Sequence, residues 1–386
     1  MRDKHINISS DSLLLKRIHA EVWNDLSGRK INITARLIFK FCFYFSFLVF
    51  FYWCILGSGS EGVLMLYYIL FGLISVLLGF NFAHDFSHNT VFKNKSLNNL
   101  CFIIIYTLLG AHAEAWKYRH IHSHHYAPNV KDYDSDLQIT SLIRVEPTSE
   151  HKWYHRYQHY YAPVLYTTYS IYWVLVKDFV IYFTDKTNPA GKTNRYHLSF
   201  WSQKLFYFTY LLLIPVLFTS FPWYFVAISF LSMHLVQSQF LLFTFFITHH
   251  VEKTAYFEVD EAGYISTSWV NNQVRSSNDF YPFSERANFI FGGFNNHIAH
   301  HLFPHIHHIH YPFINKIIYR ILRENKVEPN VTGFFSGIRS HLRHLRNMSV
   351  KKCNGDCRNC ALSKGGSEPL PVSSFHTVYT GSNRNI

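Results

Sequence analysis

Four long apolar stretches alternate with polar segments along the chain. They cover residues 37–56, 63–83, 205–221 and 223–248, and the second of them contains no charged residue. A helix of about 20 residues spans the roughly 30 Å hydrocarbon core of a bilayer. The pattern therefore predicts an all-α integral membrane protein with four transmembrane helices.

Short turns join these stretches in pairs. The turns at residues 57–62 and 221–222 contain no Lys or Arg, whereas residues 1–36, 84–204 and 249–386 are rich in both. Positively charged segments tend to stay on the cytoplasmic side of a membrane. We therefore expect two transmembrane hairpins whose turns face outward, with both termini and the long polar segments in the cytoplasm.

Two further segments are apolar but poorly suited to spanning. Residues 100–109 are too few to cross, which favours a re-entrant or interfacial piece. Residues 160–183 are aromatic but interrupted by Lys177 and Asp178, which favours a helix that lies in the membrane interface.

This pattern divides the chain into three parts. Residues 1–36 are expected to form a cytoplasmic segment, and 37–346 a membrane domain. Residues 347–386 are rich in Gly, Ser and Asn, which is typical of a flexible tail. The tail contains three closely spaced cysteines: Cys353, Cys357 and Cys360. Three thiolates could hold an iron–sulfur cluster or a zinc ion, or bind no metal at all.

Composition agrees with a membrane location. Hydrophobic residues make up 48% of the chain and charged residues only 16%. The formal net charge of +12 suits anionic lipid or an acidic partner. Nucleic acid is disfavoured as a partner, because the basic residues are dispersed among apolar spans. The 26 histidines are more than packing or pH sensing would need.

Most informative are three short histidine clusters, which all fall on the predicted cytoplasmic side. They comprise His84 and His88; His120, His124 and His125, with His122 as a competing candidate; and His297, His300 and His301. The pair His249 and His250 follows the last apolar stretch. Residues three or four apart share one face of a helix, and neutral imidazoles ligate metals. Imidazole-only sites suit iron, copper, zinc or nickel, and eight imidazoles are too many for one octahedral ion. Chance histidines at helix ends, or a loose surface tract, are the alternatives for each cluster alone.

The spacing of these clusters resembles the three histidine boxes of the membrane fatty acid desaturase family. The matching motifs are His84-x3-His88, His120-x3-His124-His125 and His297-x2-His300-His301. The surroundings of the third, from Gly292-Gly293 to Pro304 and then His310-Tyr311-Pro312, are similar to the front-end, linoleoyl-CoA-desaturase-like branch. The resemblance covers roughly residues 35–325.

This resemblance implies a fold, a cofactor and a reaction. Family members have four transmembrane helices under a cytoplasmic helical cap, and their di-iron centre activates O2 to remove two hydrogens from an acyl chain. The implied iron ligands are His84, His88, His120, His124, His125, His249, His297, His300 and His301, where His249 fits the family's place better than His250. The implied substrate is an acyl-CoA or an acyl-lipid.

The chain also departs from the family pattern. Ile121 stands where Asn is common, and Asn296 or His297 stands where many front-end enzymes have Gln. No His-Pro-Gly-Gly motif is present, so a fused b-type cytochrome domain is not recognisable. We therefore expect an external electron donor, a ferredoxin or a b-type cytochrome.

Other polar residues are candidates for supporting roles. Asp85 and Asp132 could orient ligating imidazoles, as could Asp134 and Asp136, or all four could be ordinary loop acids. Polar groups inside the fourth apolar stretch could line a substrate tunnel or bond neighbouring helices; they are His234, Gln237 and Gln239.

The sequence therefore predicts an O2-dependent, di-iron fatty acyl desaturase. A hydroxylase or ketolase of the same superfamily is the nearest alternative, because the same chemistry can add oxygen to carbon. A histidine-rich metal transporter is a more distant alternative, since it would need ligands along a path through the bilayer.

Overall fold

The computed structural model describes residues 4–29, 33–137, 140–184 and 193–350, and these residues are mostly helical. The first half contains α1 (Ser9–Gly28), α2 (Ile33–Leu56), α3 (Glu61–Leu78), α4 (His84–Ser87), α5 (Lys95–Leu109), α6 (Ala113–Arg119), α7 (Gln158–Tyr166), α8 (Tyr169–Tyr172) and α9 (Asp178–Thr184). The second half contains α10 (Asn194–Phe208), α11 (Ile214–Phe218), α12 (Trp223–His249), α13 (Trp269–Arg275), α14 (Glu285–Phe291), α15 (His297–Leu302), α16 (Tyr311–Glu324) and α17 (Phe334–Met348). Two short strands, β1 (Asp279–Phe280) and β2 (Val331–Thr332), pair in parallel. Short π-helical turns interrupt or extend several helices, at Gly79–Ala83, His120–His124, Trp173–Lys177 and Thr209–Leu213.

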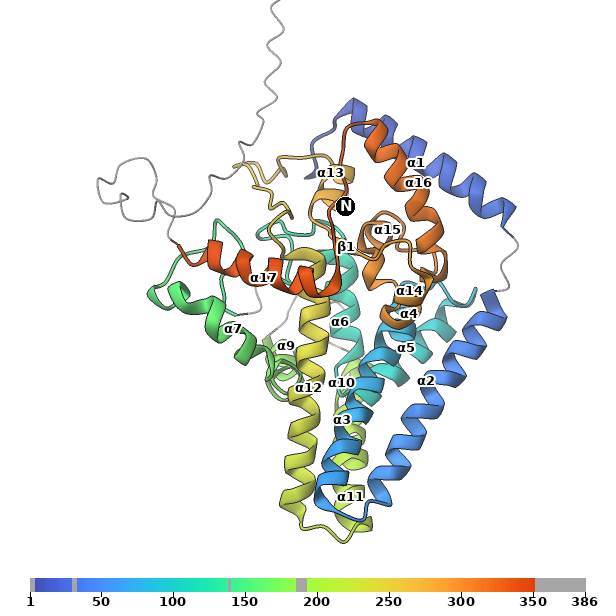
Figure 1. The fold of residues 1–386 in the computed structure, drawn as a ribbon, viewed down its shortest axis with the longest axis vertical. Coiled ribbons are helices and arrows are strands. Elements are labelled where there is room, and N and C mark those ends of the chain that lie inside the picture. Colours follow the sequence, from blue (N-terminus) through green and yellow to red (C-terminus); the bar gives the residue numbers. More distant parts are fainter. Residues whose placement is uncertain (1–3, 30–32, 138–139, 185–192, 351–386) are drawn as a thin grey trace, which may run out of the picture. The chain divides into compact units, whose positions relative to one another are not determined.

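Four helical segments are long and apolar enough to cross a membrane. They run over Ile33–Leu56, Glu61–Ser87, Asn194–Phe218 and Trp223–His249. α3 packs along both α2 and α12, and the lower ends of these helices lie near α11 (Figure 1). The third segment begins at Asn194, before the apolar stretch at 205, because Thr193 caps a polar first turn that continues into the apolar helix. These helices indicate a membrane protein.

Two further helix pairs are sharply bent. Lys95–Leu109 and Ala113–His124 meet at 111°, and Trp153–Tyr166 and Tyr169–Thr184 meet at 74°. If each bent pair is one broken span, the described residues supply up to six spans. The predicted re-entrant and interfacial segments, 100–109 and 160–183, fall within these pairs.

A buried ion pair holds the first bend. Gly110 adopts φ +76°, a conformation that ends α5, and its carbonyl accepts a hydrogen bond of 2.7 Å from Lys204 Nζ. Lys204 also donates to Asp178 at 2.7 Å, and Asp178 in turn accepts from the backbone N–H of His112, also at 2.7 Å. The bend therefore depends on contacts with α9 and α10, which are distant in sequence.

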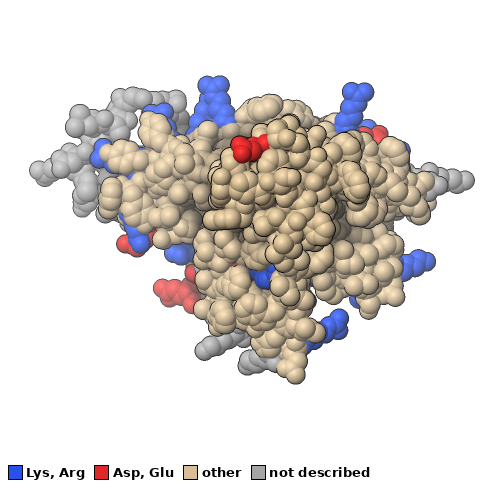
Figure 2. Space-filling view, turned by 90° about the horizontal axis from the view of Figure 1, so that it is seen from below, with Lys and Arg blue, Asp and Glu red and all other residues tan. Residues whose placement is uncertain are grey.

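The segments after α12 gather with α1 at one end of the long helices (Figure 1). α1 buries one apolar face, Leu14, Ile18 and Val22, against residues of α13 and α16. This core is separate from the one between the long helices. Seen from below, the surface is largely uncharged, and most Lys and Arg side chains project at the periphery (Figure 2). The tail cysteines Cys353, Cys357 and Cys360 lie outside the described residues.

Candidate metal centre

The ends of the two longest packed helices bring the first histidines together. His84 follows the π-helical turn at the end of α3, and His249 is the last residue of α12. Because α3 and α12 pack along each other, both imidazoles are placed at the same end of the bundle. Both side chains are buried.

A π-helical turn sets the geometry of the second histidine cluster. The backbone N–H of His125 donates to the carbonyl of His120 at 3.0 Å, an i to i+5 bond in place of the α-helical i to i+4 bond. Residues five apart are therefore aligned, and His120 Nε2 lies 3.1 Å from His125 Nε2. His124 Nδ1 contacts Asp134 at 3.2 Å, and His122 is exposed.

The third cluster lies on α15, and buried polar residues fix where this helix begins. Asp279 is fully buried and accepts from the backbone N–H of Ile298 at 2.9 Å, in the first turn of α15. Tyr319 and Asn315 of α16 donate to the same carboxylate at 2.7 and 3.1 Å. The carboxylate thus ties the start of α15 to α16.

The structure brings all nine predicted ligands together in two groups. The first group consists of His84, His88, His120, His125 and His300, and the second of His124, His249, His297 and His301. Within each group, one ligand nitrogen from every residue lies within 4.8 Å of the others. Two of the three boxes contribute to both groups: His124 separates from His120 and His125, and His300 from His297 and His301.

In His249 and His301, the hydrogen bond of Nδ1 determines whether Nε2, which faces the other imidazoles, has a free lone pair. His249 Nδ1 lies 2.9 Å from the carbonyl of Ser276, which can only accept, so this nitrogen carries the hydrogen. His301 Nδ1 lies 2.8 Å from Gln273 Oε1, and the Gln273 amide is oriented by its N–H bond to a backbone carbonyl. The Nε2 atoms of His249 and His301 therefore both present lone pairs, although they lie 3.2 Å apart.

Burial keeps several imidazoles of the centre neutral. Reinforced by the neighbouring imidazoles, it holds the pKa well below its ordinary value in His88, His125, His297, His300 and His301. Neutral imidazole is the form that binds a metal.

The carboxylates around the centre differ in what they contact. Asp134 is buried and accepts from His124 Nδ1 at 3.2 Å. Asp136 Oδ2 lies farther from the same nitrogen, at 3.9 Å. Asp132 is exposed, with φ +67°. Asp85 contacts no ligand imidazole among the described contacts.

Asp85 instead belongs to a second buried network. Its carboxylate accepts from His308 Nδ1 and lies 3.1 Å from His307 Nε2. Lys40 of α2 donates to His308 Nε2 at 2.8 Å. Residue spacing does not predict this network or the contacts of Gln273 and Asp279, because the partners are distant in the chain.

Two small cavities adjoin the histidines. The histidine cavity, of about 70 Å³, is lined by residues that include His120, His124, His249, His297 and Trp116. The inner cavity, also about 70 Å³, extends from His84 between α3 and α12 to Gln237. They share Trp116, Trp173 and Phe245 as lining residues, so they adjoin each other.

The three predicted tunnel residues lie in different places. Gln237 lines the inner cavity and donates to Ser170 Oγ at 3.1 Å and to His234 Nδ1 at 3.0 Å. His234 lies behind it, with Nε2 2.9 Å from the hydroxyl of Tyr207. Gln239 faces another helix and donates to the carbonyl of Pro163.

Known proteins resemble the chain over most of its length. The fatty acid desaturase family matches residues 61–333. An acyl-lipid (8-3)-desaturase of Physcomitrium patens is 30% identical over 337 residues, which are 84% of this chain and 69% of that protein. An sn-1 linoleoyl-lipid 6-desaturase of Arthrospira platensis is 29% identical over 287 residues, 72% of this chain and 76% of that protein. An acyl-lipid (8-3)-desaturase of Mortierella alpina is 31% identical over 292 residues, 73% of this chain and 64% of that protein.

These matches confirm the family that the histidine spacing predicted. They include all three boxes, because the matched range extends from before His84 to beyond His301. The chain therefore belongs to the fatty acid desaturase family, and it is an oxidoreductase that desaturates fatty acyl chains.

Proposed function

We propose that the nine histidines hold two iron ions, and that the protein uses O2 to introduce a double bond into the acyl chain of a membrane lipid. The observation that carries the proposal is the division of the histidines into two groups of converging imidazole nitrogens, beside an apolar cavity between the long helices.

The donor set fits two metal ions. Two nitrogens bound in adjacent positions, each about 2.1 Å from one octahedral metal, lie about 3 Å apart. The facing nitrogens of His88 and His120 lie 3.1 Å apart, and those of His297 and His301 lie 3.2 Å apart. The lone pairs of His249 and His301 would repel each other unless a shared cation lies between them. Imidazole ligands suit iron.

When bound, the two irons would activate O2 and remove two hydrogens from the chain. The residues of the protein position and shield that chemistry. Trp116 stacks on His120 with ring centres 4.3 Å apart, and it lines both cavities, so it separates the ligand from water. Asp134 orients His124, and Gln273 orients His301.

The inner cavity is suited to the distal part of an acyl chain. Its walls include Val76, Phe80 and Leu241, which are apolar, and it leads from His84 into the helix bundle. We assign Gln237 to the wall of this tunnel, and His234 to the support of Gln237. Gln239 has a structural role between helices.

The membrane orientation that we propose follows from charge. The four long helices form two hairpins whose turns face away from the cytoplasm, and the cap and both termini lie on the cytoplasmic side. The face of the bundle seen from below has few Lys and Arg side chains, as expected of a face turned away from the cytoplasm (Figure 2). An external ferredoxin or b-type cytochrome would supply electrons at the basic cytoplasmic face.

Lipid profiling tests this function. The chain is expressed in a host of defined lipid composition that is fed isotope-labelled fatty acids, beside the variant His301→Ala. For the wild type we expect labelled products that are lighter by two hydrogens, and about two irons per purified chain. For His301→Ala we expect loss of the product and of bound iron. Products that gain oxygen, or full activity in the variant, would contradict the proposal.

A further inference from the structure

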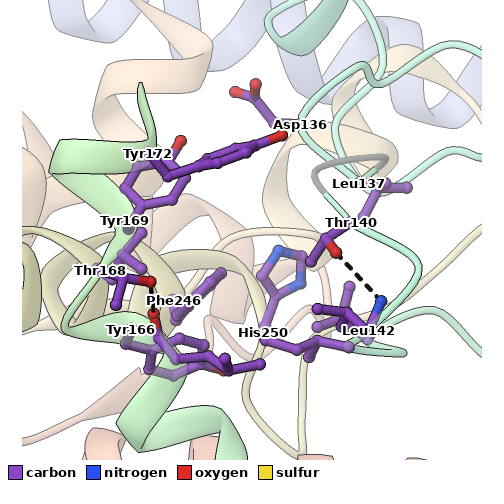
Figure 3. Close-up of a pocket in the computed structure, with 14 residues that line it drawn as sticks. Asp136, Leu137, Thr140, Leu142, Tyr166, Thr168, Tyr169, Tyr172, Phe246 and His250 are labelled. Carbon is purple, nitrogen blue, oxygen red and sulfur yellow. Dashed lines mark hydrogen bonds between the residues drawn. The ribbon is translucent and has the colours of Figure 1, made fainter. Parts of the chain in front are cut away.

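A third cavity, the outer cavity, opens beside the histidine cavity. It has a volume of about 190 Å³ and lies between α12, the helices α7 and α8, and lining residues that include Asp136 and Leu142 (Figure 3). It shares five lining residues with the histidine cavity: Asp136, Tyr169, Leu242, Phe246 and His250. The outer cavity therefore adjoins the histidine cavity, and the histidine cavity adjoins the inner cavity, so the three lie in a row beside the clustered histidines.

The imidazole ring of His250 lies at the outer cavity, whose walls are largely apolar but include three tyrosines (Figure 3). His250 Nδ1 lies 2.8 Å from the hydroxyl of Tyr256, and this hydroxyl lies 3.1 Å from His344 Nε2. His344 Nε2 is also 2.7 Å from the carbonyl of Val145.

These contacts assign the hydrogens. Since the Val145 carbonyl can only accept, His344 Nε2 carries the hydrogen of that bond. The hydroxyl hydrogen of Tyr256 then has His250 Nδ1 as its acceptor. A neutral His250 consequently carries its own hydrogen on Nε2, the nitrogen left for the cavity. The outer cavity therefore offers an N–H donor held in place by a chain of hydrogen bonds.

The charges around the cavity exclude a highly phosphorylated ligand. Among the described residues that line it, none is Lys or Arg, and the acidic residue is Asp136. Arg119 is engaged by this carboxylate at 3.4 Å, and Lys177 donates to the hydroxyl of Tyr169 at 3.2 Å. A carrier with several phosphates, such as coenzyme A, would find no free cation here.

The cavity also adjoins an apolar surface. On α7, which supplies Leu165 and Tyr166 to the cavity wall, Tyr160 and Val164 are 73 and 68% exposed. Apolar side chains exposed to this degree suit contact with acyl chains in the membrane interface. A lipid could thus reach the outer cavity from the bilayer.

We propose that the outer cavity binds the carboxyl end of an ester-linked acyl chain of a membrane lipid, and that His250 Nε2–H donates to the ester carbonyl. The proposal rests on the proposed function, because it places the rest of the chain in the histidine and inner cavities. Tyr256 is the positioning residue, since its hydroxyl fixes the tautomer of His250.

The hydrogen bond from His250 to the ester carbonyl, called the anchor below, influences the position of the double bond. His250 directly follows His249, and their ring centres lie 6.3 Å apart. A carbonyl held by His250 therefore lies only a few methylene groups from the ligand histidines. The anchor measures from the carboxyl end of the chain, so the new double bond forms near that end.

Binding of matched lipids tests the anchor. The purified iron-loaded protein in detergent is titrated with a diacyl phosphatidylcholine, with its dialkyl ether analogue, which lacks the carbonyls, and with an acyl-CoA of the same chain length. One hydrogen bond to the carbonyl predicts that the ester lipid binds about threefold to tenfold more tightly than the ether lipid. We expect His250→Leu to abolish this preference and Tyr256→Phe to reduce it. His159→Leu, on α7 but outside the cavity lining, should retain it.

The outcomes separate the two proposals. Equal affinity for ester and ether lipids, no binding of either, or tighter binding of acyl-CoA through His250 would overturn the anchor. If the wild type prefers the ester lipid but forms no desaturated product, the proposed function fails and the anchor stands. Should His250→Leu lose iron, Tyr256→Phe carries the test. In an active enzyme, either variant should also broaden the distribution of double-bond positions, and an unchanged distribution would contradict the anchor.

Discussion

Replacing Lys204 by Met removes a buried cation from the bend between α5 and α6. The Lys204 side chain is 3% exposed, and its ammonium donates to Asp178 and to the carbonyls of Gly110 and Val174, at 2.7, 2.7 and 3.0 Å. Met fills a similar volume but makes none of these bonds. Asp178 would keep two donors, the backbone N–H of His112 and Trp173 Nε1.

The magnitude follows from what is left behind. Removing one member of a buried ion pair leaves an uncompensated charge and destabilises a protein by about 3–5 kcal/mol. Asp178→Asn leaves the Lys204 ammonium without its anion and should also cost about 3–5 kcal/mol. In the double variant neither charge remains, so its loss of stability should fall short of the sum by about 2 kcal/mol.

Unfolding of the purified protein by sodium dodecyl sulphate, followed by tryptophan fluorescence, measures these free energies. Lys316→Met, at an exposed position of α16, is the matched control and should change stability little. A loss below about 1 kcal/mol for Lys204→Met would contradict a desolvated ion pair at this bend, because breaking such a pair costs more. Strict additivity in the double variant would show that the two charges do not interact.

Three further predictions concern the metal centre. Asp134→Asn should lower iron affinity about 10- to 100-fold, measured by chelator competition, because His124 loses its carboxylate partner; the exposed Asp132→Asn should leave affinity unchanged. Gly292→Ala should reduce both iron content and activity, since Gly292 has φ +60° and an added Cβ would lie 2.3 Å from the carbonyl oxygen of Phe80; normal iron content would contradict this packing. Removal of iron by a chelator should lower the thermal unfolding midpoint, and readdition should restore it; an unchanged midpoint would argue against convergent ligands.

The pattern of apolar stretches was sufficient to predict the four long helices, but it did not predict the bends between the shorter ones. A span is specified by its own residues, so residues 63–83 could be identified directly. The bend at Gly110 depends on Lys204 and Asp178, which lie on other helices. Likewise, the start of α10 at Asn194 is set by a Thr193 cap in a polar stretch. Tertiary contacts of this kind leave no periodic signal.

For the centre, spacing selected the nine histidines that the structure brings together, but not their division into two groups. An α-helix would align His120 with His124, whereas the π-helical turn aligns His120 with His125. The hydrogen-bonding partners of the imidazoles could not be predicted from spacing. Gln273 and Ser276 are ordinary residues in the sequence. The packing of α13 against α15 places Gln273 beside His301, and the carbonyl of Ser276 meets His249 at the end of α12.

The partition of the boxes also bears on how the centre is assembled. α15 supplies His300 to one group and His297 and His301 to the other, and the turn at His120–His124 is divided in the same way. An ion bound by either group immobilises backbone that the other group needs. The loss of backbone conformational entropy occurs when the first ion binds. The second ion then binds backbone that is already ordered, so its binding is more favourable than that of the first. Loading should therefore be cooperative, with empty and doubly occupied protein predominating over the singly occupied form during iron titration.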